Sequence, residues 1–77
     1  MKKLMFFLSE EEAARVEPIL YSIRAADCTF AYKFYRLSSE PNKFLLVVAC
    51  KDENEAHKRG MWLRDKLFGN NKLYFVK

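Results

Sequence analysis

Two segments of the chain are apolar at nearly every position, which excludes strands with one polar face. Residues 4–8 read LMFFL and residues 44–50 read FLLVVAC. Successive side chains of a strand point to opposite faces of its sheet, so these two strands are apolar on both faces. The pattern predicts two central strands of one sheet. The longer run is far below the roughly 20 apolar residues that cross a bilayer, so a membrane span is excluded.

Capping and periodicity place a helix after the first strand. Ser9 and Glu12 have the spacing of a capping box, which predicts a helix over residues 10–26. Pro18 lies inside this helix and is expected to kink it, since proline lacks the backbone donor. Apolar residues at three- and four-residue spacing predict its buried stripe: Val16, Ile19, Leu20 and Ile23.

Turn signals divide the rest of the chain. Residues 29–37 alternate in polarity, the segment SSEPNK at 38–43 favours a turn, and the two flanking strands then form a hairpin. Asp52 predicts the start of a second helix, and Gly69 predicts its end. Residues 72–76 form the expected last strand. The second helix has its own predicted buried stripe: Ala56, Gly60, Leu63 and Leu67.

The expected order is strand, helix, strand, strand, helix, strand. This βαββαβ order resembles the ferredoxin-like sandwich, an α+β fold with a four-stranded antiparallel sheet and two helices on one face. In that fold the first and third strands are central, as the two apolar segments require. A chain of 77 residues suits a single domain, residues 1–77.

Two helices can cover only one face of such a sheet, so apolar side chains must remain on the other. Each large apolar side chain left in water forfeits about 1.5 to 3 kcal/mol of burial. We therefore expect a protein partner on the open face or an edge strand, either a second copy in a homodimer or a heterologous protein. The candidate protein-binding residues are Phe6, Phe7, Tyr32, Phe34, Phe44, Leu46 and Trp62.

The chain carries 14 Lys and Arg against 10 Asp and Glu, so nucleic acid is the alternative partner. RNA-recognition domains share the element order, but they place a glycine and two aromatic residues in the third strand. The corresponding segment, residues 42–49, has Phe44 alone. The alternative basic and aromatic surface consists of Lys33, Arg36, Lys58, Arg59, Trp62 and Lys66.

No motif for chemistry is recognisable. The single histidine, His57, and the two separated cysteines, Cys28 and Cys50, do not have the spacing of metal ligands. A Cys50–His57 nucleophile pair would lack an orienting third group. We therefore expect no enzyme, no metal and no cofactor.

The sequence therefore predicts a small non-enzymatic interaction module, such as a regulator, adaptor or inhibitor. Only two cysteines and no signal peptide pattern predict reduced thiols and a cytoplasmic location.

Overall fold

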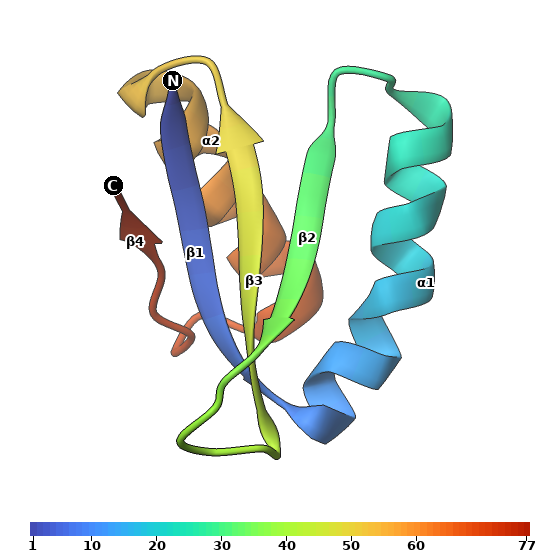
Figure 1. Cartoon of the computed structure of the whole chain (residues 1–77). Helices are drawn as coiled ribbons and strands as arrows, with labels where there is room; N and C mark the ends of the chain where they lie inside the picture. The colour runs from blue at the N-terminus through green and yellow to red at the C-terminus, as the bar shows by residue number, and fades with distance from the viewer.

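The computed structural model describes residues 1–77 and has the predicted order of elements. Figure 1 shows a sheet with α2 behind it and α1 beside β2. The elements are β1 (Lys2–Ser9), α1 (Glu10–Ala26), β2 (Ala31–Arg36), β3 (Lys43–Cys50), α2 (Glu53–Leu63), η1 (Arg64–Phe68, a turn of π-helix) and β4 (Phe75–Val76).

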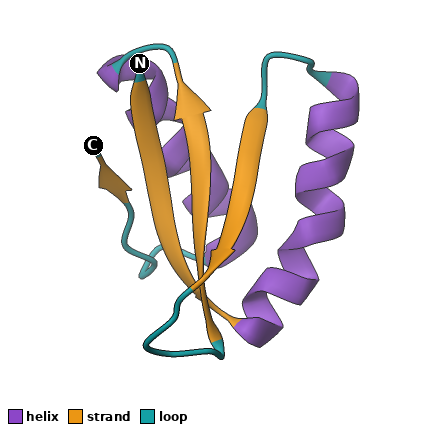
Figure 2. Ribbon diagram, in the orientation of Figure 1, coloured by secondary structure: helices purple, strands orange, loops and turns teal.

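The four strands form one sheet in the order β2-β3-β1-β4, and every neighbouring pair is antiparallel. The two strands that are apolar on both faces, β1 and β3, are therefore central (Figure 2). This arrangement confirms the ferredoxin-like α+β fold.

The register decides which face of each central strand packs against the helices. Phe6 of β1 is paired with Leu46 of β3, and both side chains are fully buried. Because alternate residues share a face, the helix-facing residues are the even-numbered ones. The core consists of twelve hydrophobic residues: Leu4, Phe6, Leu8, Ala13, Val16, Leu20, Phe30, Leu46, Val48, Cys50, Ala56 and Leu63.

Helix α1 begins with the predicted capping box. The Glu12 N–H donates to Ser9 Oγ at 3.1 Å, and the Ser9 N–H donates to Glu12 Oε1 at 3.0 Å. The helix continues through Pro18 without interruption, so the expected kink does not divide it. Ile19 was predicted in the buried stripe but is 39% exposed, because it lies at the margin of the face that contacts the sheet.

The second helix changes its hydrogen bonding before it ends. After Leu63 the chain forms the π-helical turn η1, and the Gly69 N–H donates to Arg64 O, five residues earlier. Gly69 has φ of 92°, a backbone conformation that favours glycine. The predicted stop at Gly69 is therefore confirmed. No helix of the structure combines the length and the apolar character needed to cross a membrane.

The last strand is shorter than predicted, since only Phe75 and Val76 pair with β1. Tyr74 lies just before it, with its ring 5.9 Å from that of Phe6 and in direct contact with α2 at Gly60. Because the Tyr74 side chain packs in this way, residues 72–74 do not pair with β1. The second strand is also shorter, because Thr29 donates to Asp27 Oδ1 in a turn.

Candidate functional site

The sheet face away from the helices is open, and the register places its side chains in three rows. One row runs Lys77, Lys3, Ala49, Ala31 across the four strands. The next row is Phe75, Met5, Val47, Lys33. The third contains Phe7, Leu45 and Tyr35. The two helices leave all of these side chains uncovered or only partly covered by neighbours.

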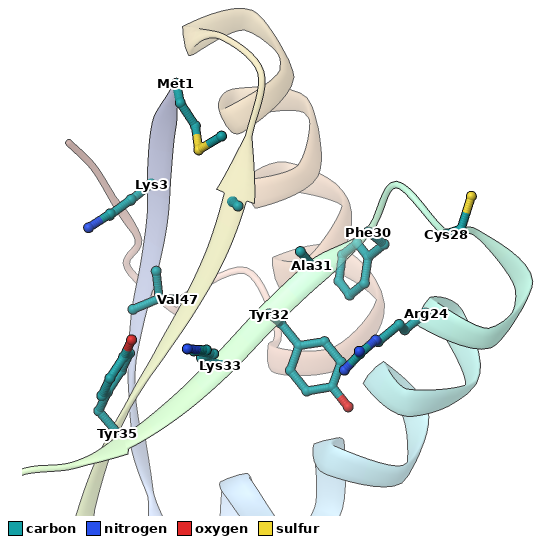
Figure 3. Close-up of a pocket in the computed structure, with 11 residues that line it drawn as sticks. Met1, Lys3, Arg24, Cys28, Phe30, Ala31, Tyr32, Lys33, Tyr35 and Val47 are labelled. Atoms are coloured by element: carbon teal, nitrogen blue, oxygen red, sulfur yellow. The ribbon is translucent and has the colours of Figure 1, made fainter.

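The first row contains a hollow. Ala31 and Ala49 are directly opposed on β2 and β3, and their methyl groups leave room that larger side chains would fill. A cavity of about 410 Å³ lies here, and Val47 and Tyr35 also line it. Figure 3 shows that the lining of this cavity lies on both sides of β2. Lys3, Lys33, Tyr35 and Val47 belong to the open face, whereas Arg24 and Tyr32 lie on the side of α1. This volume is in the range of sites for small molecules.

A second cavity, of about 560 Å³, adjoins the first on the same face. The two share Met1, Lys3, Tyr35 and Val47 as lining residues. Together the two cavities extend along the open face from the alanine pair toward Lys77. We call these two cavities the open-face hollow; the alanine pair forms the floor of the first.

Basic residues line the two cavities, and acidic residues do not. Lys3 and Lys33 line the first cavity together with Arg24, and Lys77 lines the second. No aspartate or glutamate lines either cavity. The open-face hollow is therefore apolar at its floor and positively charged at its margin.

The third row and β4 form an exposed apolar area without charged side chains. Phe7 is 48% exposed and Phe75 is 47% exposed, and their rings meet edge to face at 5.7 Å. Leu73 precedes β4 and is 71% exposed. We call this area the apolar patch; it consists of Phe7, Tyr35, Leu45, Leu73 and Phe75.

The loop after α1 presents a cysteine at the rim of the hollow. Cys28 is exposed and carries a free thiol. The neighbouring Asp27 is held by Thr29, whose hydroxyl donates to Asp27 Oδ1 at 2.6 Å and whose N–H donates at 2.9 Å. These bonds, chiefly that from the hydroxyl, lower the pKa of Asp27 below its usual value. The turn that carries Cys28 is thereby fixed in position.

A smaller cavity of about 250 Å³ lies on the helix side, between the end of α1 and α2. Trp62 and Arg59 line it. The Arg59 guanidinium lies 5.3 Å from the Phe30 ring centroid, and its Nε is 3.7 Å from Glu55 Oε1. Arg59 Nη1 is buried without a hydrogen-bond partner. Arg59 thus packs α2 against Phe30, in the loop that follows α1.

The structure does not bring the predicted protein-binding residues together. Phe6 and Leu46 are fully buried, so they are core residues and cannot contact a partner in the folded chain. Phe7 lies on the open face, whereas Trp62 is exposed on α2. The remaining three lie partly buried on the helix side of the sheet: Tyr32, Phe34 and Phe44.

The alternative basic surface is also divided. Lys33 lies on the open face, whereas Arg36 lies on the helix-facing side of β2. The Arg36 guanidinium is 4.7 Å from the Phe44 ring centroid. The other four residues belong to α2 and η1: Lys58, Arg59, Trp62 and Lys66. A single strand of nucleic acid would not meet all six on one face.

Neither the histidine nor the cysteines form a reactive cluster. His57 Nδ1 lies 3.2 Å from the hydroxyl of Tyr74, so the ring is engaged by the segment before β4. Burial raises the pKa of the Cys50 thiol, which disfavours its thiolate. No three side chains of His, Cys, Asp or Glu lie close enough together to hold a metal ion.

Sequence reasoning missed the residues that make the open-face hollow: Lys3, Ala31, Tyr35 and Ala49. The alternation in 29–37 was visible, but the opposition of Ala31 and Ala49 depends on the register of β2 against β3. The signal that could have found them is the presence of a small residue in each of two strands predicted to pair.

Comparison with solved structures supports the fold. The chain is similar to a protein from Deinococcus radiodurans described as a "putative antibiotic biosynthesis monooxygenase", with 18% identity, a TM-score of 0.54, and coverage of 100% of this chain and 90% of that one. A dimeric ferredoxin-like protein from an uncultured marine organism matches at 17% identity over 99% of this chain and 85% of its own, with a TM-score of 0.39. That score is too low to support an argument. No protein-family model and no curated protein matches the chain.

The first of these similarities overturns the prediction of a non-enzymatic interaction module. That prediction treated the lack of a recognisable catalytic motif as the lack of an enzyme. The same fold, over the whole chain, occurs in a protein described as a monooxygenase. The predictions of no enzyme and of a non-enzymatic interaction module, with nucleic-acid binding as its alternative, are therefore corrected. At 18% identity the likeness itself shows the fold alone.

Proposed function

We propose that the chain is a small enzyme of the oxygenase class that binds a small, largely apolar substrate in the open-face hollow. The observation that carries this proposal is the hollow itself, floored by Ala31 and Ala49 and ringed by polar side chains that can orient a ligand. The monooxygenase description of the Deinococcus radiodurans protein supplies the reaction class.

Tyr35 and Lys33 are the residues best placed to orient such a substrate. Tyr35 lines both cavities of the hollow, and its phenol offers a hydrogen-bond donor beside an aromatic face. Lys33 lies on the same strand face, two residues earlier. Both side chains project from a paired strand, which gives more precise positioning than a loop.

We further propose that the working form is a homodimer in which the apolar patches of two copies pack together. The five residues of the patch are uncharged, and the adjacent Lys72 is already paired with Glu12, so a second copy can cover the patch without leaving a charge unpaired. Phe7, Phe75 and Leu73 would lose exposed apolar area in such a contact. The second copy would also roof the neighbouring hollow and reduce the access of water to it.

A reducing compartment such as the cytoplasm is the proposed location. Both Cys28 and Cys50 are free, and Cys28 is exposed. An exposed free thiol is more compatible with a reducing compartment than with an oxidising one.

The enzyme proposal is tested by incubating the purified protein with a panel of dihydroxynaphthalenes under isotopically labelled oxygen. Oxidation of such a substrate to a hydroxyquinone supplies the two electrons that reduce the second oxygen atom to water. We expect oxygen uptake and the labelled atom in a product identified by mass spectrometry. Ala49→Leu fills the floor of the hollow and should abolish turnover while the chain stays folded. Lys58→Gln, on α2, is the matched surface control and should leave turnover unchanged. Equal turnover by Ala49→Leu and the wild type would place the chemistry elsewhere.

Self-association is tested separately, by sedimentation equilibrium. We expect the wild type to approach twice the chain mass of 9.2 kDa. Phe7→Lys introduces a charge into the apolar patch and should shift the protein to monomer. Tyr21→Lys changes an exposed aromatic residue on α1 and should leave the mass unchanged. A monomeric wild type at high concentration would contradict the dimer.

A further inference from the structure

We infer that the ligand of the open-face hollow is an organic anion: a small molecule with an apolar, ring-containing body and one carboxylate or similar acidic group. This inference deepens the proposed function. The role of the anion as a substrate rests on that proposed function. The binding itself depends only on the hollow and its charges.

The register places two lysine residues on the strands that flank β3. Lys3 on β1 is paired with Ala49, and Lys33 on β2 is paired with Val47, two residues along β3. Neighbouring strands lie about 4.8 Å apart, so each lysine begins one strand away from the floor formed by β3. The long, flexible side chains of both can therefore reach an acidic group held above Ala49.

No carboxylate of the chain neutralises these lysines. The ion pairs of the structure are Lys72–Glu12, Arg59–Glu55 and His57–Glu53, and none of them includes Lys3, Lys33 or Lys77. Arg24 also lines the cavity, but from α1 on the helix side of the sheet. A ligand carboxylate would supply the missing negative charge through charge-assisted hydrogen bonds.

The apolar part of the ligand follows from the rest of the lining. The part of the cavity of about 410 Å³ that lies on the open face has these apolar lining residues: Met1, Ala31, Tyr35, Val47 and Ala49. Tyr35 provides an aromatic wall beside the alanine floor, and Val47 lies between them in the sheet. This combination excludes a bare inorganic anion as the best ligand, because such an anion would leave the apolar lining uncovered.

A matched pair of probes separates charge from shape: 1-naphthoate and the neutral 1-naphthalenemethanol. Binding to the full chain is measured by isothermal titration calorimetry, with amide chemical shifts to locate it. We expect naphthoate to bind about tenfold more tightly than the alcohol, as one charge-assisted hydrogen bond would produce. We also expect shifts at Ala31 and Ala49.

Four variants complete the test. Lys33→Gln and Lys3→Gln should each reduce naphthoate affinity several-fold and leave the alcohol unaffected. Lys58→Gln removes the same charge from the helix side and should change neither affinity. Ala49→Leu should abolish binding of both probes.

The outcomes distinguish this inference from the proposed function. Equal affinity for the two probes would overturn the anion inference and leave an apolar substrate site intact. Naphthoate binding that persists in Ala49→Leu, or that falls equally in Lys58→Gln, would mean attraction to the overall positive charge and would also overturn it. Oxygen uptake does not enter these measurements, so an inactive protein that still prefers the anion would contradict only the reaction class.

Discussion

Lys72 donates from Nζ to both carboxylate oxygens of Glu12, at 2.9 Å each, and so links the segment before β4 to the first turn of α1. Glu12 also accepts the Ser9 N–H of the capping box. Burial alone would raise the pKa of Glu12, but the bond from Ser9 and the bond and charge of Lys72 together lower it below its ordinary 4.5. The Glu12 carboxylate thus stabilises the start of α1 and also holds the segment before β4 against it.

We expect Glu12→Gln to lower the free energy of unfolding by about 1 to 2 kcal/mol at neutral pH, since it weakens a cap and removes an ion pair. Because the pKa is lower in the folded state, this contribution is complete above about pH 4.5 and is lost as the pH falls through the folded value. Urea unfolding across this pH range measures it, and the variant and the wild type should converge in acid.

Glu11→Gln is the control, since Glu11 lies in the same turn without a bond to Lys72. A difference between Glu12→Gln and the wild type that stays constant down to acid pH would contradict the role of the Glu12 charge.

Gly60 lies directly beneath the ring of Tyr74, and an added Cβ would meet Cε1 of that ring at 2.8 Å. We expect Gly60→Ala to be destabilising, because overpacking costs about 1 to 3 kcal/mol and outweighs the gain in helix propensity of up to about 1 kcal/mol. Thermal or urea unfolding measures the change. In a Tyr74→Ala background the ring is gone, so Gly60→Ala should become neutral or stabilising. Equal destabilisation in both backgrounds would contradict the close contact.

The sequence was sufficient to predict the order of elements and the sheet topology. The two segments that are apolar on both faces could only be central, and the cap residues Ser9 and Asp52 marked where both helices begin. Each of these signals depends on residues that are close together in the chain, so it can be recognised in a single sequence. The short β4 was not predictable in the same way, because it depends on a distant contact between Tyr74 and Gly60.

The candidate site was harder to predict than the fold for the same reason. Apolar alternation showed that one face of the sheet would be uncovered, but not whether Phe6 or Phe7 would lie on it. A shift of one residue exchanges every side chain between the two faces. The register of β1 against β3 places Phe6 in the core, so five of the seven residues predicted for protein binding lie on the helix side of the sheet.

The contrast between Phe6 and Phe7 is itself testable. Phe6→Leu leaves a gap in the core and should lower the free energy of unfolding by about 1 to 2 kcal/mol. Phe7→Leu should change it by less than about 0.5 kcal/mol, because Phe7 is half exposed. Unfolding is followed at a concentration low enough to keep the chain monomeric. Equal losses for the two neighbouring substitutions would contradict the register.

The two cysteines should differ sharply in reactivity. Cys28 is exposed at the rim of the hollow, whereas Cys50 is in the core and burial raises the pKa of its thiol. Alkylation needs an accessible thiolate, so iodoacetamide should add one group per native chain and two groups per chain in urea. Mass spectrometry counts the groups, and Cys28→Ser, which should remain unmodified until it unfolds, is the control. Rapid modification of Cys50 in the native Cys28→Ser protein would show that the end of β3 opens at a free energy well below that of global unfolding.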